Sequence, residues 1–447
     1  MKTKTLRKGL AIVLCLGTVV SMITVYLSLT AACTVAPNTH VKSSAEPTTL
    51  RPPAQASDIV LEWNQQAVAL TLSTPAALTS VQQMRVMAIF QLAMHDAVNG
   101  ITRKYQTYLS PPPPPENASP DAAAIAAAHY ALKKLFSGND ASLDSLYQSS
   151  LAAHGLSETD PGIKFGESAA TAILALRAND HSAQAQFDYD APGAGEPGVW
   201  VRLNNAPAQL PGWGNVTPFV LRSASQFHPE PPPALDSEEY AKDYNEIKEI
   251  GISSSSTRST EQSQIALFWR ASPTAIWNSV LTQLLPTKDF DLSDKVRVFG
   301  LLYLAAADAS IACWEAKYAY NFWRPQLAIR NGDIDGNDLT AGNLTWQPFI
   351  ATPPHPEYPS GHSTNSSAMA HILASVFEDN PGVPIVVTLS GITRRWNSLS
   401  EGVEEVIDAR VYSGIHFRNS DEVGARMGRQ VAQFVANHAL RRCKKSC

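Results

Sequence analysis

The sequence predicts a mainly α-helical protein built from helical bundles, and two observations support this. Apolar side chains make up 44% of the 447 residues, which is enough for a sizeable core. They recur at helical spacing through most of the chain, and only residues 384–389 form a convincing strand-like run. Lys and Arg number 35 against 40 Asp and Glu, so the net charge is −5. This balance excludes a general nucleic-acid-binding protein, because no broad basic surface is available.

The first 33 residues have the composition of an export signal. Basic residues precede an apolar run from Leu10 to Leu29, and Ala31-Ala32-Cys33 offers small residues for cleavage. A cleaved signal peptide, a lipoprotein signal with Cys33 as the lipidated residue, and an uncleaved membrane anchor are all open. In each case we expect the rest of the protein to be exported, to the periplasm, the cell envelope or the medium. Residues 34–57, rich in Pro, Thr, Ser and Ala, predict a flexible linker.

Residues 58–234 are predicted to form an N-terminal helical region. A capping-box pattern at Ser80–Gln83 starts one helix, and Ser119 followed by Pro120 starts another, because proline suits the first helical position. The helices expected here span residues 80–100, 119–136, 140–154 and 160–178. Residues 182–234 are rich in Gly, Pro and Trp and predict a long irregular segment. A segment of this length usually serves function or joins domains.

Residues 235–447 are predicted to form a C-terminal helical domain. The helices expected there span residues 236–250, 261–284, 293–322, 363–378, 399–413 and 421–441, and Pro325 stops the third of them. No stretch beyond the leader is expected to cross a membrane. Cys443 and Cys447 end the chain, and both a disulfide and a pair of free thiols are open, since this spacing on a regular helix fits a disulfide poorly.

Three separated clusters in this second region carry side chains that suit one tetrahedral oxyanion. In the first cluster, Lys317 and Arg324 lie seven residues apart, so two helical turns place both on one face. Arginine provides a planar fork of donors and lysine a compact charge, which together suit neighbouring oxygens of one anion. The residues between them are largely aromatic and indicate a partly buried wall, where unpaired cations are unfavourable.

The second cluster is Pro359-Ser360-Gly361-His362, directly before a predicted helix. Gly361 allows a backbone N–H to approach a ligand, and the start of the helix favours an anion. Ser360 adds a hydroxyl donor. His362 could exchange a proton with a ligand oxygen.

The third cluster supplies a second guanidinium, Arg410, and the imidazole of His416. Taken singly, the three clusters also fit a solvated helix face, a helix cap and a core histidine. Their occurrence together, each with a different part of an oxyanion site, makes that site the favoured interpretation.

The clusters resemble the signature of the superfamily shared by vanadium-dependent haloperoxidases and type 2 phosphatidic acid phosphatases. That signature reads Lys-x6-Arg-Pro, then Pro-Ser-Gly-His, then Ser-Arg-x5-His-x3-Asp. The flanks look more like the haloperoxidase branch, in the stretches Asn321–Pro325, His355–Ser363 and Val60–Val98. The resemblance therefore covers most of the chain after the linker, and it implies the helical fold of these enzymes.

Two positions depart from this signature. Ala409 replaces the Ser that usually precedes Arg410. The Asp that orients the last His in the family falls at Ser420 here, and Asp421 follows one residue later. Orientation of His416 by Asp421 and orientation by another group are both open.

The resemblance implies vanadate as the cofactor. Its equatorial oxygens would be held by Lys317, Arg324, Ser360, the N–H of Gly361, and Arg410. His416 would be the vanadium ligand, and His362 the acid–base residue that handles the protons of hydrogen peroxide. Catalysis would rest on the two histidines together with the three cations.

The expected reaction is oxidation of a halide by hydrogen peroxide to a hypohalous species, with a small organic acceptor. A soluble phosphomonoesterase is one alternative, with His416 as nucleophile and His362 as general acid. A non-catalytic oxyanion-binding protein is another. We expect the halide preference of the first candidate to depend on Tyr358, Trp314 and Trp346.

Overall fold

The structure is a computed structural model that describes residues 58–73 and 78–444. Three predicted features lie outside the described residues: the leader (1–33), the linker (34–57) and Cys447. The possible disulfide between Cys443 and Cys447 is therefore also outside them. The described residues all belong to one compact unit. They form 13 α-helices, five short 3-10 helices and one two-stranded sheet, which confirms the mainly α class. The division between residues 234 and 235 stays a prediction.

The N-terminal region contains the four predicted helices and one more that precedes them. In order these are α1 (Ile59–Ser73), α2 (Ser80–Thr102), α3 (Pro120–Leu135), α4 (Asp140–Ala153) and α5 (Pro161–Arg177). The capping box of α2 lies one residue earlier than predicted, between Thr79 and Gln82. Gly100 does not end this helix. A Cβ at Gly100 would lie 2.8 Å from the ring of Phe165, so the glycine allows α5 to pack closely on α2.

The irregular segment at 182–234 is confirmed, and a buried carboxylate anchors it. The segment contains only the 3-10 turns Ser182–Gln184, Leu203–Asn205 and Trp213–Asn215. Asp308 accepts the backbone N–H groups of three consecutive residues, Phe219, Val220 and Leu221, at 2.6, 2.7 and 2.8 Å. Burial raises the pKa of Asp308 to about 6, although the three N–H groups and Arg177 favour its charged form.

The C-terminal region differs from the prediction at three places. Its helices are α6 (Glu238–Ile250), α7 (Thr260–Phe268), α8 (Pro273–Leu284), α9 (Leu292–Tyr320), α10 (Pro325–Arg330), α11 (Gly361–Phe377), α12 (Leu399–Tyr412) and α13 (Arg418–His438). The helix predicted over 261–284 is broken, because Ser272 caps a new helix that begins at Pro273. The short α10 was not predicted. Strand β1 (Ile385–Leu389) pairs antiparallel with β2 (Ile392–Trp396), which the apolar pattern missed because β2 contains two arginines.

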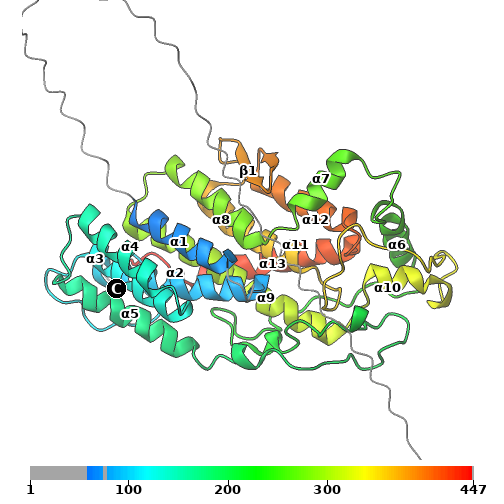
Figure 1. Ribbon diagram of the computed structural model, residues 1–447, viewed down its shortest axis with the longest axis horizontal. Coiled ribbons are helices and arrows are strands. Elements are labelled where there is room, and N and C mark those ends of the chain that lie inside the picture. The colour runs from blue at the N-terminus through cyan, green and yellow to red at the C-terminus, as the bar shows by residue number, and fades with distance from the viewer. Residues whose placement is uncertain (1–57, 74–77, 445–447) are drawn as a thin grey trace, which may run out of the picture. The chain divides into compact units, whose positions relative to one another are not determined.

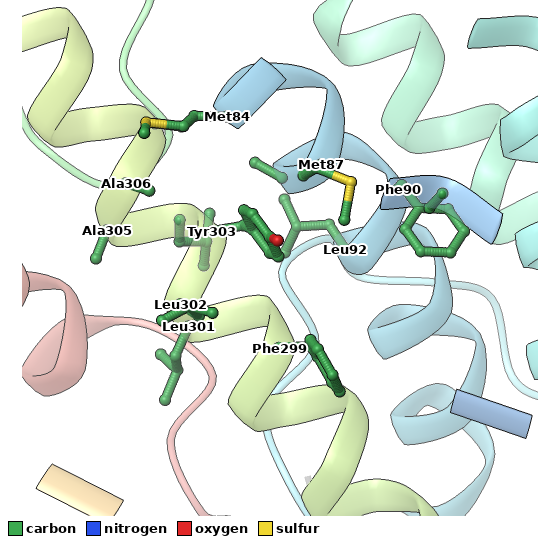
Figure 2. Packing of buried hydrophobic residues seen from close by; sticks show 14 of the residues in the cluster. Met84, Met87, Phe90, Leu92, Phe299, Leu301, Leu302, Tyr303, Ala305 and Ala306 are labelled. Atoms are coloured by element: carbon green, nitrogen blue, oxygen red, sulfur yellow. The ribbon is translucent and has the colours of Figure 1, made fainter. Parts of the chain in front are cut away.

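Helix α9 forms the centre of the core and packs against α2, α11 and α13 (Figure 1). Figure 2 shows Tyr303 of α9 beside Leu92 of α2, within the same buried cluster as Phe299 and Met87. Contrary to the sequence-based expectation, α9 is long and apolar enough to cross a membrane by length and composition. However, 94% of its most apolar window is buried inside the protein, which is the packing of a core helix.

This packing brings the three clusters together. The end of α9 carries Lys317, the start of α11 carries Ser360 and Gly361, and the connection between α12 and α13 carries His416. Because α9, α11 and α13 contact one another (Figure 1), residues distant in the sequence meet at one place. Asn321, in the left-handed conformation with φ of +48°, ends α9 and turns the chain toward Arg324.

We expect Asp308→Asn to lower the free energy of unfolding by about 1–3 kcal/mol, because an amide leaves buried hydrogen-bonding groups unpaired. Urea denaturation at neutral pH measures this change. The matched control is Asp289→Asn, at an exposed position, which should change the free energy by no more than about 0.5 kcal/mol. Equal stability of the two variants would contradict an anchoring role for Asp308.

Candidate oxyanion site

Lys317 lies in the last turn of α9 and is fully buried. Its Nζ donates to the carbonyl oxygens of Pro356 and Glu357 at 3.0 and 2.8 Å. Burial, together with the nearby Arg324, lowers the pKa of Lys317 to about 8. The ammonium group therefore depends on acceptors of the loop that precedes α11.

Arg324 stands at the N-cap position of α10, with its guanidinium fully buried. Nε donates to the carbonyl oxygen of His355 at 2.8 Å, and Nη1 donates to that of Ile415 at 2.8 Å. Nη1 also lies 3.1 Å from Nε2 of His416, and Nη2 lies 2.9 Å from Nδ1 of His355. The guanidinium thus joins the first cluster to the third.

The second cluster forms the start of α11, as predicted. Ser360 is the N-cap residue and Gly361 the first helical residue. A Cβ at Gly361 would lie 3.1 Å from the indole of Trp314 and 3.8 Å from Cε of Lys317, so this backbone faces the lysine closely. The side chain of His362 is partly exposed, although its Nε2 is buried, and desolvation together with Arg410 holds its pKa well below the usual range, so the ring is neutral.

The third cluster lies at the end of α12 and in the turn that follows. Nη1 of Arg410 donates to the carbonyl oxygen of Trp269 at 2.9 Å. Burial lowers the pKa of Arg410 to about 10. His416 is buried, and its pKa is held well below the usual range by burial and by Arg324, Lys317 and Arg410. A neutral His416 therefore faces three cations.

Positive charge exceeds negative charge at this site and indicates an anion, because the two buried carboxylates, Glu357 and Asp421, have raised pKa values. Lys317, Arg324 and Arg410 are 0%, 0% and 3% exposed. Their partners are carbonyl oxygens and imidazole nitrogens, and within residues 58–73 and 78–444 no carboxylate forms an ion pair with any of the three. Buried cations are unfavourable without a counter-charge. A bound oxyanion would supply it.

Unpartnered polar atoms point to the same ligand. His362 Nε2 and Arg410 Nε are buried, and neither has a hydrogen-bond partner among the described residues. Buried polar groups are normally paired, so these two atoms indicate a ligand. The residues present, a hydroxyl, a helix start, three cations and the ring nitrogen of His362, fit a tetrahedral oxyanion such as vanadate or phosphate.

The carboxylate that contacts His416 is Glu357, to which the sequence reasoning gave no role. Oε1 of Glu357 lies 2.7 Å from Nδ1 of His416, whereas Asp421 accepts the hydroxyl of Ser363 at 2.7 Å. Of the two carboxylates, Glu357 is therefore the one placed beside this ring. A sequence signal for this contact was present, because His355-Pro356-Glu357 directly precedes the second cluster and places a carboxylate near it. Burial raises the pKa of Glu357 to about 7, opposed by Arg324 and Lys317.

Of the three aromatic residues expected to govern halide preference, one lies at the site. Trp314 packs against His355, with ring centroids 4.9 Å apart. The hydroxyl of Tyr358 donates instead to the carbonyl oxygen of Glu230 at 2.6 Å, and the indole of Trp346 donates to that of Lys248 at 2.9 Å. His355, which contacts Arg324, is a second residue at the site to which no role was assigned from sequence.

Comparisons with known proteins agree with this geometry. Residues 297–445, which contain all three clusters, match the family model of the VCPO second helical-bundle domain. The vanadium chloroperoxidase of Curvularia inaequalis is 25% identical, in a match that covers 73% of this chain and 66% of that protein. The chain is therefore similar to vanadium haloperoxidases, most clearly over residues 297–445. It spans slightly less than two thirds of the length of this chloroperoxidase.

Solved structures of the family share the fold. A bacterial vanadium-dependent iodoperoxidase superposes with a TM-score of 0.71 at 26% identity, covering 87% of this chain and 96% of that one. The holo form of a bacterial vanadium-dependent chloroperoxidase gives a TM-score of 0.66 at 17% identity, covering 86% and 97%. The second likeness concerns the fold alone. Haloperoxidase architecture therefore extends well beyond the matched domain.

We expect the affinity for sulfate to fall as the pH rises through about 8, because Lys317 must be protonated to bind an anion and its pKa is about 8 without one. Sulfate keeps its charge over this range, so calorimetric titration reports the protein. Lys317→Met should bind sulfate about tenfold or more weakly at pH 7 and lose the change near pH 8. Lys288→Met, at an exposed lysine, is the control. An unchanged pH profile in Lys317→Met would contradict the assignment.

Proposed function

We propose that this chain is a vanadate-dependent haloperoxidase, which uses hydrogen peroxide to oxidise a halide to a hypohalous species. The observation that carries the proposal is the set of three buried cations that form no ion pair with a carboxylate among the described residues, gathered around a neutral His416 whose Nε2 contacts Arg324. An oxyanion needs the cations, and a metal centre needs a ligand nitrogen. Similarity to vanadium haloperoxidases supports the choice of vanadate.

The cations and donors of the chain would bind the cofactor. Lys317, Arg324 and Arg410 would neutralise its oxygens, and the Ser360 hydroxyl and the Gly361 N–H would donate to them. His416 would present Nε2 to the vanadium, since Nδ1 is engaged by Glu357. When bound, vanadate supplies a centre that activates hydrogen peroxide for two-electron oxidation without a change in the oxidation state of vanadium.

His362 would handle the proton of the peroxide. Its ring is neutral, and its buried Nε2 has no hydrogen-bond partner among the described residues, so it can accept a proton from a ligand oxygen. The three fixed cations stabilise negative charge that develops on peroxide oxygens, without reorganising during the reaction. Because the site is buried, water competes poorly for these donors. A halide and a small organic acceptor complete the proposed reaction.

We expect His362→Ala to lower kcat by about 10²- to 10⁴-fold while it retains vanadate, because general acid–base catalysis contributes this much. Oxidation of chloride, bromide and iodide, followed with a phenolic dye in the presence of vanadate and peroxide, measures the change. His371→Ala is the matched control, because this half-buried histidine lies on the same helix and has no role in the proposed reaction. Bound vanadate without turnover of any halide by the wild-type protein would reject the proposal.

A phosphomonoesterase remains the second candidate, and one observation favours it. Glu357 orients His416 as a third group orients the base or nucleophile of a catalytic dyad. His416 would then attack phosphorus and His362 would protonate the leaving group. Hydrolysis of p-nitrophenyl phosphate that vanadate inhibits and peroxide does not affect would establish this function. Anion binding with neither activity would instead indicate a binding protein.

Export is a further part of the proposal, and it is supported only by the leader sequence. The basic start, the apolar run and the small residues that end at Cys33 are typical of an export signal. Mass spectrometry of the mature protein would distinguish a cleaved signal, a lipidated Cys33 and an uncleaved anchor.

A further inference from the structure

Glu357 is a fully buried carboxylate in the loop between α10 and α11, three residues before Ser360. Its Oε1 lies 2.7 Å from Nδ1 of His416 and accepts the backbone N–H of Phe417 at 3.1 Å. Two nitrogens from the same turn therefore converge on one carboxylate oxygen. This arrangement fixes both the ring of His416 and the chain that carries it.

The backbone of Glu357 extends the connection to the other clusters. Its N–H donates to the carbonyl oxygen of Phe322 at 2.9 Å, and its carbonyl oxygen accepts Nζ of Lys317 at 2.8 Å. Its chain continues through Tyr358 and Pro359 into the start of α11. Glu357 thus connects the loop before α11 to the end of α9, to the segment that follows α9 and to the turn before α13.

The position at which the family signature has its orienting Asp is used differently here. Ser420 accepts the backbone N–H of Ser360 through its carbonyl oxygen at 3.0 Å, so this part of α13 adjoins the start of α11. The side chain of Ser420 has no carboxylate, so another residue must supply the one that contacts His416. Asp421, one residue later, bonds to Ser363 instead. The carboxylate that meets His416 therefore comes from the loop and not from α13.

We propose that Glu357 is the positioning residue of His416 and takes the place of the family's Asp at position 420. It holds the ring with Nδ1 protonated, so that the lone pair of Nε2 points to the cations of the pocket. The inference rests on the proposed function in one respect, since the role of His416 as the vanadium ligand belongs to that function. Partners that orient a metal-ligating histidine typically change affinity by about 10- to 100-fold when they are removed.

The test reads the ring of His416 directly, by 15N NMR of histidine-labelled full-length protein without added anion. We expect the Nδ1–H tautomer in the wild-type protein and its loss in Glu357→Ala. The double variant Glu357→Ala/Ser420→Asp should restore it, because a carboxylate returns at the position of the family signature. Asp421→Asn is the matched control, a buried carboxylate beside the site that does not contact His416, and should leave the tautomer unchanged.

Vanadate affinity, measured by quenching of tryptophan fluorescence, gives a second readout. We expect Glu357→Ala to bind about 10- to 100-fold more weakly and the double variant to regain much of this loss. Glu357→Gln, whose amide oxygen can still accept Nδ1–H, covers the case in which the alanine variant does not fold; it should keep the tautomer and bind vanadate more weakly than the wild-type protein.

Two results would overturn the inference. One is a wild-type ring with Nε2 protonated. The other is a tautomer and affinity that removal of the Glu357 carboxylate leaves unchanged. If the tautomers behave as expected but the wild-type protein oxidises no halide, the proposed function fails and the positioning role stands.

Discussion

Burial of three cations without carboxylate partners is the constraint on which this structure depends. Removing Lys317, Arg324 and Arg410 from water is unfavourable, and carbonyl oxygens alone compensate it only in part. The surrounding fold must hold these groups against their mutual repulsion. The core does so by packing α11 against both α9 and α12, so that the end of α9, the start of α11 and the end of α12 bring Lys317, Ser360 and Arg410 to one place.

The loop from His355 to Ser360 completes the site. Arg324 bonds to His355, Lys317 bonds to the carbonyl oxygens of Pro356 and Glu357, and Glu357 bonds to His416. This loop is therefore the element that couples cation placement to histidine orientation. Its interactions explain why a departure from the family signature at Ser420 leaves the pocket intact: the carboxylate needed by His416 comes from the other side.

Local sequence signals predicted much of this fold. Ser119 and Pro120 specify the start of α3. The spacing of apolar residues predicts α9 and α11 as helices without knowledge of what those residues contact. The predictions failed where tertiary packing decides. Gly100 resembles a helix stop but serves the contact with Phe165. Strand β2 was missed for a local reason, because two arginines interrupt its apolar pattern beside the predicted strand β1. The three clusters could be assembled from sequence because each motif supplies a different chemical part. The pairing of Glu357 with His416 could not, because it joins residues 59 positions apart.

The most direct test of the central claim is the vanadium content of the full-length protein after equilibration with vanadate and removal of free anion. Bulk elemental analysis by inductively coupled plasma mass spectrometry gives this number without relying on any activity. Three buried cations around the imidazole of His416 predict about one vanadium atom per chain, which excess phosphate displaces. A chain that retains no vanadium, or retains it equally when Arg324 and Arg410 are both replaced by methionine, would contradict the account.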